Sequence, residues 1–343
     1  MARRASRNYD PLGRGYRPGR RWGKWRLIPP IFLLLVPSSH GLAQSGLAQN
    51  TPPQGEFRIS TDVELVLLDV SVKQAKGGYA SGLSRDNFQV YENGTPQKIT
   101  EFASADIPIA VGLVFDDSGS MRSKRPDVIT AGLVFIGASN PQDQIFVVNF
   151  NDKVRRGLPE NVPFTDNINL LRAALSRDVA QGQTALYDAV AFALKHLESG
   201  RREKKALMVV SDGGDNVSTR TLKELMQLVQ ESRATIYTVG IFDPDDPDRN
   251  PQVLERFAKV SGGESFLPGA LDEVVPICRQ IAKDIRNRYT IGYIPVHNSN
   301  KAALRKIHVV ATAPDRGKLV VRTRTSYLLP AGESRARYAG PVK

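Results

Sequence analysis

The chain of 343 residues contains one cysteine, Cys278. A single thiol cannot form an internal disulfide, so the fold must hold through its hydrophobic core even in an oxidising compartment. Cys278 lies in an apolar helical pattern, and the local sequence offers nothing that would lower the thiol pKa. We therefore expect a buried structural cysteine and not a reactive thiol.

Several signatures of catalytic and metal sites are also missing. The sequence contains no Gly-x-Ser-x-Gly, no Walker loop, no His-Glu-x-x-His and no paired cysteine motif. The four histidines are scattered along the chain, at His40, His196, His297 and His308. Apart from His40, which lies in the basic leader, we expect them on the surface or in packing and not as ligands.

No apolar run reaches the length of about 20 residues that a membrane-spanning helix needs. The apolar run Leu27–Val36 is about half that length, follows a basic stretch and precedes the small residues Gly41–Ala43. This order predicts a secretory signal cleaved near Ala43, so residues 1–43 form the signal peptide. Pro29 and Pro30 argue against an uncleaved anchor. We expect a periplasmic or secreted protein with no stable membrane span after cleavage.

The net charge of +12 is concentrated in this leader, because residues 1–43 carry nine basic residues and one acidic residue. The remaining 300 residues have a net charge of only +4. A basic stripe with interleaved aromatics is therefore not a feature of the mature chain. We expect no nucleic-acid partner.

One short stretch combines a buried strand with a cluster of oxygen ligands. Val111–Phe115 is apolar without a helical period, which predicts a strand buried on both faces of a parallel sheet. Asp116, Ser118 and Ser120 follow at alternate positions. A carboxylate and two hydroxyls suit a small hard cation, Mg²⁺ or Mn²⁺, better than zinc or copper.

Two later stretches supply further oxygen atoms. Thr184 stands just before a helical run, and Asp212 follows the buried strand 206–211. In an open parallel sheet, loops at the carboxyl ends of neighbouring strands converge where the strand order reverses. We therefore expect Asp116 and Asp212 to face one ion.

The five residues together resemble the metal-ion-dependent adhesion site of the von Willebrand factor A family. That site is written Asp-x-Ser-x-Ser, then a distant Thr, then a distant Asp, which Asp116, Ser118, Ser120, Thr184 and Asp212 match in order. The resemblance implies one bound Mg²⁺ or Mn²⁺ whose open coordination position accepts an Asp or Glu carboxylate. It thus implies an adhesion module for a protein or cell-envelope ligand, and no enzymatic turnover. It also implies that Asp117 points away from the ion, as a solvated residue.

The order of strands and helices predicts the architecture. Residues 57–105 and 288–330 read as β segments, and residues 106–287 alternate strand and helix. The prediction is a doubly wound, mostly parallel α/β sheet inserted in or flanked by a smaller all-β sandwich-like domain. Residues 44–56 are a linker, and residues 331–343 a tail. With the closing strand at Arg288–Tyr293, the chain resembles the secreted bacterial group of VWFA-related acidobacterial domain proteins.

Local signals place individual elements. Asn93-Gly94 predicts a hairpin turn, Asp166 is available to cap a helix over 167–175, and Thr221 with Glu224 forms a capping box. We expect strands at 63–72, 87–91, 97–102, 144–150, 234–241, 289–296, 306–312 and 318–326, and further helices at 126–138, after Thr184, 252–260 and 271–285.

Two alternatives concern other uses of the acidic residues. A Mg²⁺-dependent phosphatase of the haloacid dehalogenase type also has a strand-end Asp, but its chemistry needs a second carboxylate two residues later, where this chain has Ser118.

The acidic stretch Asp243–Asp248 is a candidate Ca²⁺ loop, but it lacks the glycine and the bidentate glutamate of an EF-hand. A solvated, proline-stiffened loop beside the ion site is the favoured interpretation.

Overall fold

The computed structural model describes residues 65–242, 249–296 and 304–328. The predicted signal peptide, the linker, the acidic loop at 243–248, His297 and the tail lie outside these residues. Among the helices described, none is both long and apolar enough to cross a membrane.

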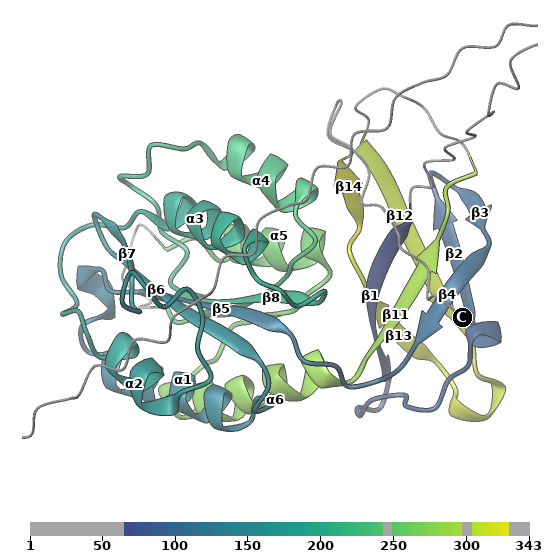
Figure 1. The fold of residues 1–343 in the computed structure, drawn as a ribbon, viewed down its shortest axis with the longest axis horizontal. Helices are drawn as coiled ribbons and strands as arrows, with labels where there is room; N and C mark the ends of the chain where they lie inside the picture. The colour runs from purple at the N-terminus through teal and green to yellow at the C-terminus, as the bar shows by residue number, and fades with distance from the viewer. Residues whose placement is uncertain (1–64, 243–248, 297–303, 329–343) are drawn as a thin grey trace, which may run out of the picture. The chain divides into compact units, whose positions relative to one another are not determined.

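A six-stranded sheet runs through the part of the chain shown on the left of Figure 1. Its strand order is β10-β9-β8-β5-β6-β7, and every neighbouring pair is parallel except β6 with β7. The strands are β5 (Ala110–Asp116), β6 (Gln144–Phe150), β7 (Val154–Arg156), β8 (Lys205–Ser211), β9 (Thr235–Gly240) and β10 (Ser265–Phe266).

Helices of the described residues cover both faces of this sheet (Figure 1). One face carries α3 (Leu186–Glu198), α4 (Leu222–Glu231) and α5 (Pro251–Ser261), and the other carries α1 (Arg125–Gly137), α2 (Ile168–Leu175) and α6 (Val274–Arg286). Every residue of β5 is buried, as its apolar sequence predicts for a strand covered on both sides. The doubly wound α/β fold class is confirmed.

Close packing at the middle of β5 depends on a glycine. A Cβ atom added to Gly112 would lie 2.5 Å from Leu207 Cδ2 and 2.5 Å from Phe146 Cζ. Leu207 and Phe146 belong to the strands on either side, β8 and β6. The missing side chain therefore lets the two neighbours fill the space over the strand that carries Asp116.

Two antiparallel four-stranded sheets are built from the segments that precede and follow the α/β part. Their orders are β13-β1-β11-β4 and β14-β12-β2-β3, and buried side chains of both sheets form one hydrophobic core. β1 pairs with β11 and β13, so chain segments more than 200 residues apart complete one sheet. The strands are β1 (Val66–Gln74), β2 (Phe88–Glu92), β3 (Thr95–Gln97), β4 (Ile99–Ala103), β11 (Arg288–Tyr293), β12 (Leu304–Ala311), β13 (Leu319–Arg322) and β14 (Ser326–Leu328).

Several local predictions can be compared with these elements. The Thr221 capping box is confirmed, and Asn93 has the positive φ of 49° that its hairpin turn requires. The predicted Asp166 cap is wrong, because the Asn167 side chain accepts the amides of Asn169 and Leu170. The single strand predicted at 318–326 is also wrong, since β13 and β14 lie in different sheets.

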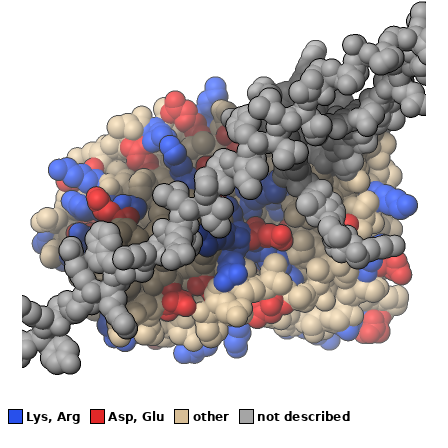
Figure 2. All heavy atoms as spheres, in the orientation of Figure 1, with Lys and Arg blue, Asp and Glu red and all other residues tan. Residues whose placement is uncertain are grey.

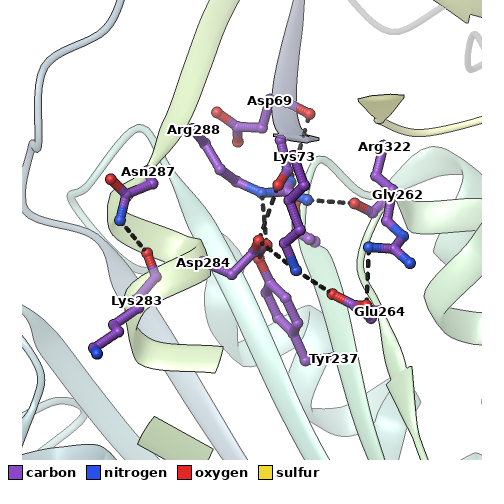
Figure 3. Close-up of polar contacts among 12 residues, drawn as sticks. Asp69, Lys73, Tyr237, Gly262, Glu264, Lys283, Asp284, Asn287, Arg288 and Arg322 are labelled. Carbon is purple, nitrogen blue, oxygen red and sulfur yellow. Dashed lines mark hydrogen bonds and ion pairs between the residues drawn. The ribbon is translucent and has the colours of Figure 1, made fainter. Parts of the chain in front are cut away.

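A buried ion network joins β1 to the end of α6 (Figure 3). The Asp284 carboxylate accepts hydrogen bonds from Tyr237 Oη at 2.6 Å and Ser71 Oγ at 2.9 Å. It also lies 3.3 Å from Lys73 Nζ and 3.5 Å from Arg288 Nε. Burial alone would raise the pKa of Asp284, but Arg288, Lys73 and these hydrogen bonds hold it below its ordinary value. The network therefore stabilises the charged carboxylate inside the fold.

The charges on the surface are mixed. On the face drawn in Figure 2, acidic and basic side chains of the described residues are interspersed among uncharged ones.

Candidate metal centre

The predicted ligands lie at the carboxyl ends of two adjacent parallel strands. Asp116 is the last residue of β5, and Asp212 directly follows β8. β6 lies on one side of β5, whereas β8 and β9 lie on the other. The strand order therefore reverses between β5 and β8, and their outgoing loops leave a crevice at this point for oxygen-bearing side chains.

Four of the five predicted residues form one hydrogen-bonded group. Asp116 Oδ1 accepts the backbone amide of Ser118 at 2.8 Å, which bends the loop back on the strand end. Ser118 Oγ lies 3.2 Å from Ser120 Oγ, and Ser120 Oγ donates to Asp212 Oδ2 at 2.6 Å. The structure thus places both carboxylates and both serine hydroxyls together.

Thr184 is buried, and hydrogen bonds attach its loop to the loops that carry the other four residues. Its amide donates to Asn216 Oδ1 at 2.9 Å, and its carbonyl accepts the Asn216 amide at 3.0 Å. On the other side, the Gly119 amide donates to the Gly182 carbonyl at 3.0 Å. The loop that carries Thr184 is therefore held against both ligand loops.

The electrostatics of the centre favour a cation. Asp116 and Asp212 are 2% and 3% exposed. Burial, and then the charge of Asp212, raise the pKa of Asp116 to about 7, although hydrogen bonds from Ser118 and Ser211 oppose this rise. The opposing contributions named here are hydrogen bonds and not a positive charge. A divalent cation between the carboxylates would supply the missing positive charge, so the residues present fit the ion that the sequence predicts.

The donor set decides which ions suit the centre. In the part of the chain that the structure describes, no three His, Cys, Asp or Glu side chains cluster as a metal site. Two carboxylates alone are a weak ligand set, so the serine and threonine hydroxyls must contribute. Such all-oxygen sets suit Mg²⁺ or Mn²⁺.

Ser211 supports Asp116 and was missed by the sequence analysis. Its hydroxyl is fully buried, donates to Asp116 Oδ2 at 2.6 Å and accepts the Gly213 amide at 3.0 Å. It fixes the orientation of the carboxylate from behind. A hydroxyl residue directly before the strand-end Asp212 was the available signal.

Asp117 is not the solvated residue that we expected. It is 1% exposed, and Arg125 Nη1 donates to its Oδ1 at 2.6 Å. Burial raises the pKa of Asp117 to about 7 in spite of the Arg125 charge. The prediction was wrong because the Asp117 amide still donates to the Phe150 carbonyl of β6 at 2.7 Å, which holds the residue within the fold.

Cys278 and His196 are accounted for by packing, whereas His308 is exposed. Cys278 is fully buried, burial raises the pKa of its thiol to about 12, and the structural role is confirmed. The His196 ring lies 4.3 Å from that of Phe146, and the His308 ring lies 6.2 Å from that of Tyr91.

The part of the chain that carries the predicted ligands is similar to known proteins. The profile of the von Willebrand factor type A domain matches residues 111–274. Inter-alpha-trypsin inhibitor heavy chain H4 of Bos taurus is 25% identical over 227 residues, which cover 63% of this chain and 23% of that protein. The chain therefore spans about a quarter of that relative's length.

Solved structures of similar fold have low sequence identity. A von Willebrand factor type A structure from Catenulispora acidiphila is 15% identical, with a TM-score of 0.48, covering 78% of this chain and 74% of the other. The vWF domain of the type V pili tip protein Mfa5 from Porphyromonas gingivalis is 14% identical, with a TM-score of 0.42, covering 53% and 96%.

Proposed function

Because residues 111–274 form a von Willebrand factor type A domain, we propose that this chain is an exported, metal-dependent adhesion module. Its Mg²⁺ or Mn²⁺ centre captures an acidic residue of a protein or cell-envelope partner. Such domains commonly bind proteins. For this chain we propose in addition that binding needs the metal ion and that the protein is exported.

The observation that carries the proposal is the 2.6 Å hydrogen bond from Ser120 Oγ to Asp212 Oδ2. It brings oxygen ligands from two loops to one point, beside the Asp116 carboxylate. Asp116, Asp212 and the hydroxyls of Ser118, Ser120 and Thr184 would hold the ion. The two carboxylates balance its charge and the hydroxyls add none, so the bound ion supplies a Lewis-acidic position for a carboxylate from outside.

Neighbouring side chains hold the proposed metal ligands in place. Ser211 holds the Asp116 carboxylate in place through its 2.6 Å hydrogen bond. The bonds between Thr184 and Asn216 keep the third loop near the centre. Burial of both carboxylates excludes bulk water, which strengthens the attraction between the ion and a partner carboxylate.

The phosphatase alternative is disfavoured by the residue at position 118. In a phosphatase of the haloacid dehalogenase type, Asp116 would attack phosphorus and a second carboxylate would stand at position 118. This chain has Ser118 there, whose hydroxyl lies 3.2 Å from that of Ser120. We propose a binding protein and no enzymatic turnover.

The predicted signal peptide indicates where the protein acts. The apolar run Leu27–Val36 with Gly41–Ala43 supports export, so the partner belongs to the periplasm, the cell envelope or the medium.

The experiment uses the mature chain, immobilised and exposed to an envelope extract in Mg²⁺ or in EDTA. We expect capture in Mg²⁺, release in EDTA, and no capture by Asp116→Ala. Amidation of the carboxyl groups in the extract should remove binding, because the ion then lacks its partner ligand. In parallel, an aryl phosphate should not be hydrolysed above the buffer rate.

Capture that survives EDTA and persists in Asp116→Ala would contradict the adhesion function. Aryl phosphate turnover that is lost in Asp116→Asn would instead support the phosphatase.

A further inference from the structure

We infer that Arg125 is a positioning residue that locks the Thr184 loop onto the Asp116 loop, and that metal affinity depends on this lock. The inference rests on the proposed metal centre. The hydrogen bonds of Arg125 go to Asp117, Leu175 and Asp178 and to none of the five predicted ligands.

Arg125 connects two parts of the chain through one guanidinium group. It is the first residue of α1, and its Nη1 donates to Asp117 Oδ1 at 2.6 Å. Its Nη2 donates to the Leu175 carbonyl at 3.2 Å and to the Asp178 carbonyl. Leu175 ends α2, and Asp178 lies in the segment that leads from α2 to Thr184.

The segment between α2 and Thr184 is also held by backbone hydrogen bonds. The Gln181 amide donates to the Asp117 carbonyl at 2.9 Å, and the Gly119 amide donates to the Gly182 carbonyl at 3.0 Å. Arg122 Nε adds a bond to the Ala180 carbonyl at 3.2 Å. Residues 178–182 are thus attached to the Asp-x-Ser-x-Ser loop, and Thr184 follows two residues later.

The chemistry of this position requires arginine. The guanidinium presents several donors in a fixed plane, so it reaches the carboxylate on one side and two carbonyls on the other. Its charge is also favourable beside the carboxyl end of α2, where carbonyl groups are left unpaired. Lysine keeps the charge but has one ammonium group, which cannot span both sides.

The expected consequence is a change in metal affinity. Removal of a group that orients a metal ligand typically lowers affinity by about 10- to 100-fold. Because Arg125 acts on the Thr184 loop, its effect should require the Thr184 hydroxyl. A general loss of stability would show no such requirement.

The test is a double-mutant cycle read by Mg²⁺ calorimetry on the mature chain. The variants are Arg125→Lys, Thr184→Ala and both together, with Arg316→Lys, in the turn between β12 and β13, as a matched control. We expect Arg125→Lys to weaken Mg²⁺ binding by about tenfold or more, and to change it less than twofold once Thr184 is alanine. The control should bind Mg²⁺ like the wild type.

Equal effects of Arg125→Lys with and without the Thr184 hydroxyl would overturn the inference, as would an unchanged affinity. If Arg125→Lys does not fold, Asp117→Asn takes its place in the same cycle with the same expected coupling. Wild-type protein that fails to bind Mg²⁺ would contradict the proposed function itself. Wild-type binding with additive mutant effects would contradict only the positioning role.

Discussion

Ser120 donates a 2.6 Å hydrogen bond to Asp212, a residue 92 positions later in the chain. The bond joins the loop after β5 to the loop after β8, two strands that lie side by side in the parallel sheet. The sheet therefore sets the distance between the two loops, and the loops set the direction of the oxygen atoms. The metal centre that we propose depends on both.

Ser211→Ala tests the support of Asp116 from behind. The substitution removes the 2.6 Å hydrogen bond to Asp116 Oδ2 and leaves the five predicted ligands in place. We expect Mg²⁺ affinity to fall roughly tenfold, as is typical when a group that orients a ligand is removed. Calorimetry provides the measurement, and Ser199→Ala, at an exposed serine, is the control. An unchanged affinity would mean that Ser211 does not orient Asp116.

Gly112→Ala tests the packing beneath the centre. The new methyl group would meet Leu207 and Phe146 at 2.5 Å, so side chains in the core must move. We expect a loss of about 1–3 kcal/mol in the free energy of unfolding. Gly137→Ala, at the exposed end of α1 with no atom within 4 Å, should be neutral or stabilising by up to about 1 kcal/mol. Equal stability of the two variants in urea would contradict this account.

Asp284→Asn tests the buried ion network. The variant leaves the buried Arg288 without its carboxylate and Lys73 paired with Glu264 alone, so it should lose about 3 kcal/mol or more at neutral pH. The pKa of Asp284 is depressed in the fold. Its charge therefore stabilises the protein above the unfolded pKa of about 3.9, and this contribution is lost as pH falls through the folded pKa.

The measurement is urea unfolding of both proteins at a series of pH values. Their difference in stability should be constant above about pH 5 and should shrink in stronger acid. Asp315→Asn, at a carboxylate on the surface, is the control and should change little. A difference that stays constant down to pH 2 would show that Asp284 does not titrate as described.

Most of the correct predictions rested on the hydrophobic pattern of the strands and on the polar residues at their ends. β5 is apolar up to its last residue, Asp116, so both the parallel sheet and the location of its loops could be read from the chain. The same holds for the Thr221 capping box, whose residues are local in sequence.

The errors concern contacts that local sequence does not encode. Asp117 looked solvated because its partner Arg125 belongs to the next helix, and the bonds of Arg125 to residues 175 and 178 depend on the tertiary fold. Ser211 lies 95 positions from Asp116, so no pattern within one motif links them. The division of residues 319–328 between two sheets likewise depends on pairing with β1 and β12. The signal peptide and the narrower bacterial group stay predictions.

The most direct test of the central claim is a calorimetric titration of the mature chain with Mg²⁺, compared with Asp116→Ala. We predict one bound ion per chain in the wild type and none in the variant, with circular dichroism showing the same fold for both. Mn²⁺ should displace the bound Mg²⁺ from this same site, with one ion bound per chain. Unchanged Mg²⁺ affinity in Asp116→Ala, or no binding by a folded wild type, would contradict the claim that Asp116, Ser118, Ser120, Thr184 and Asp212 hold a metal ion.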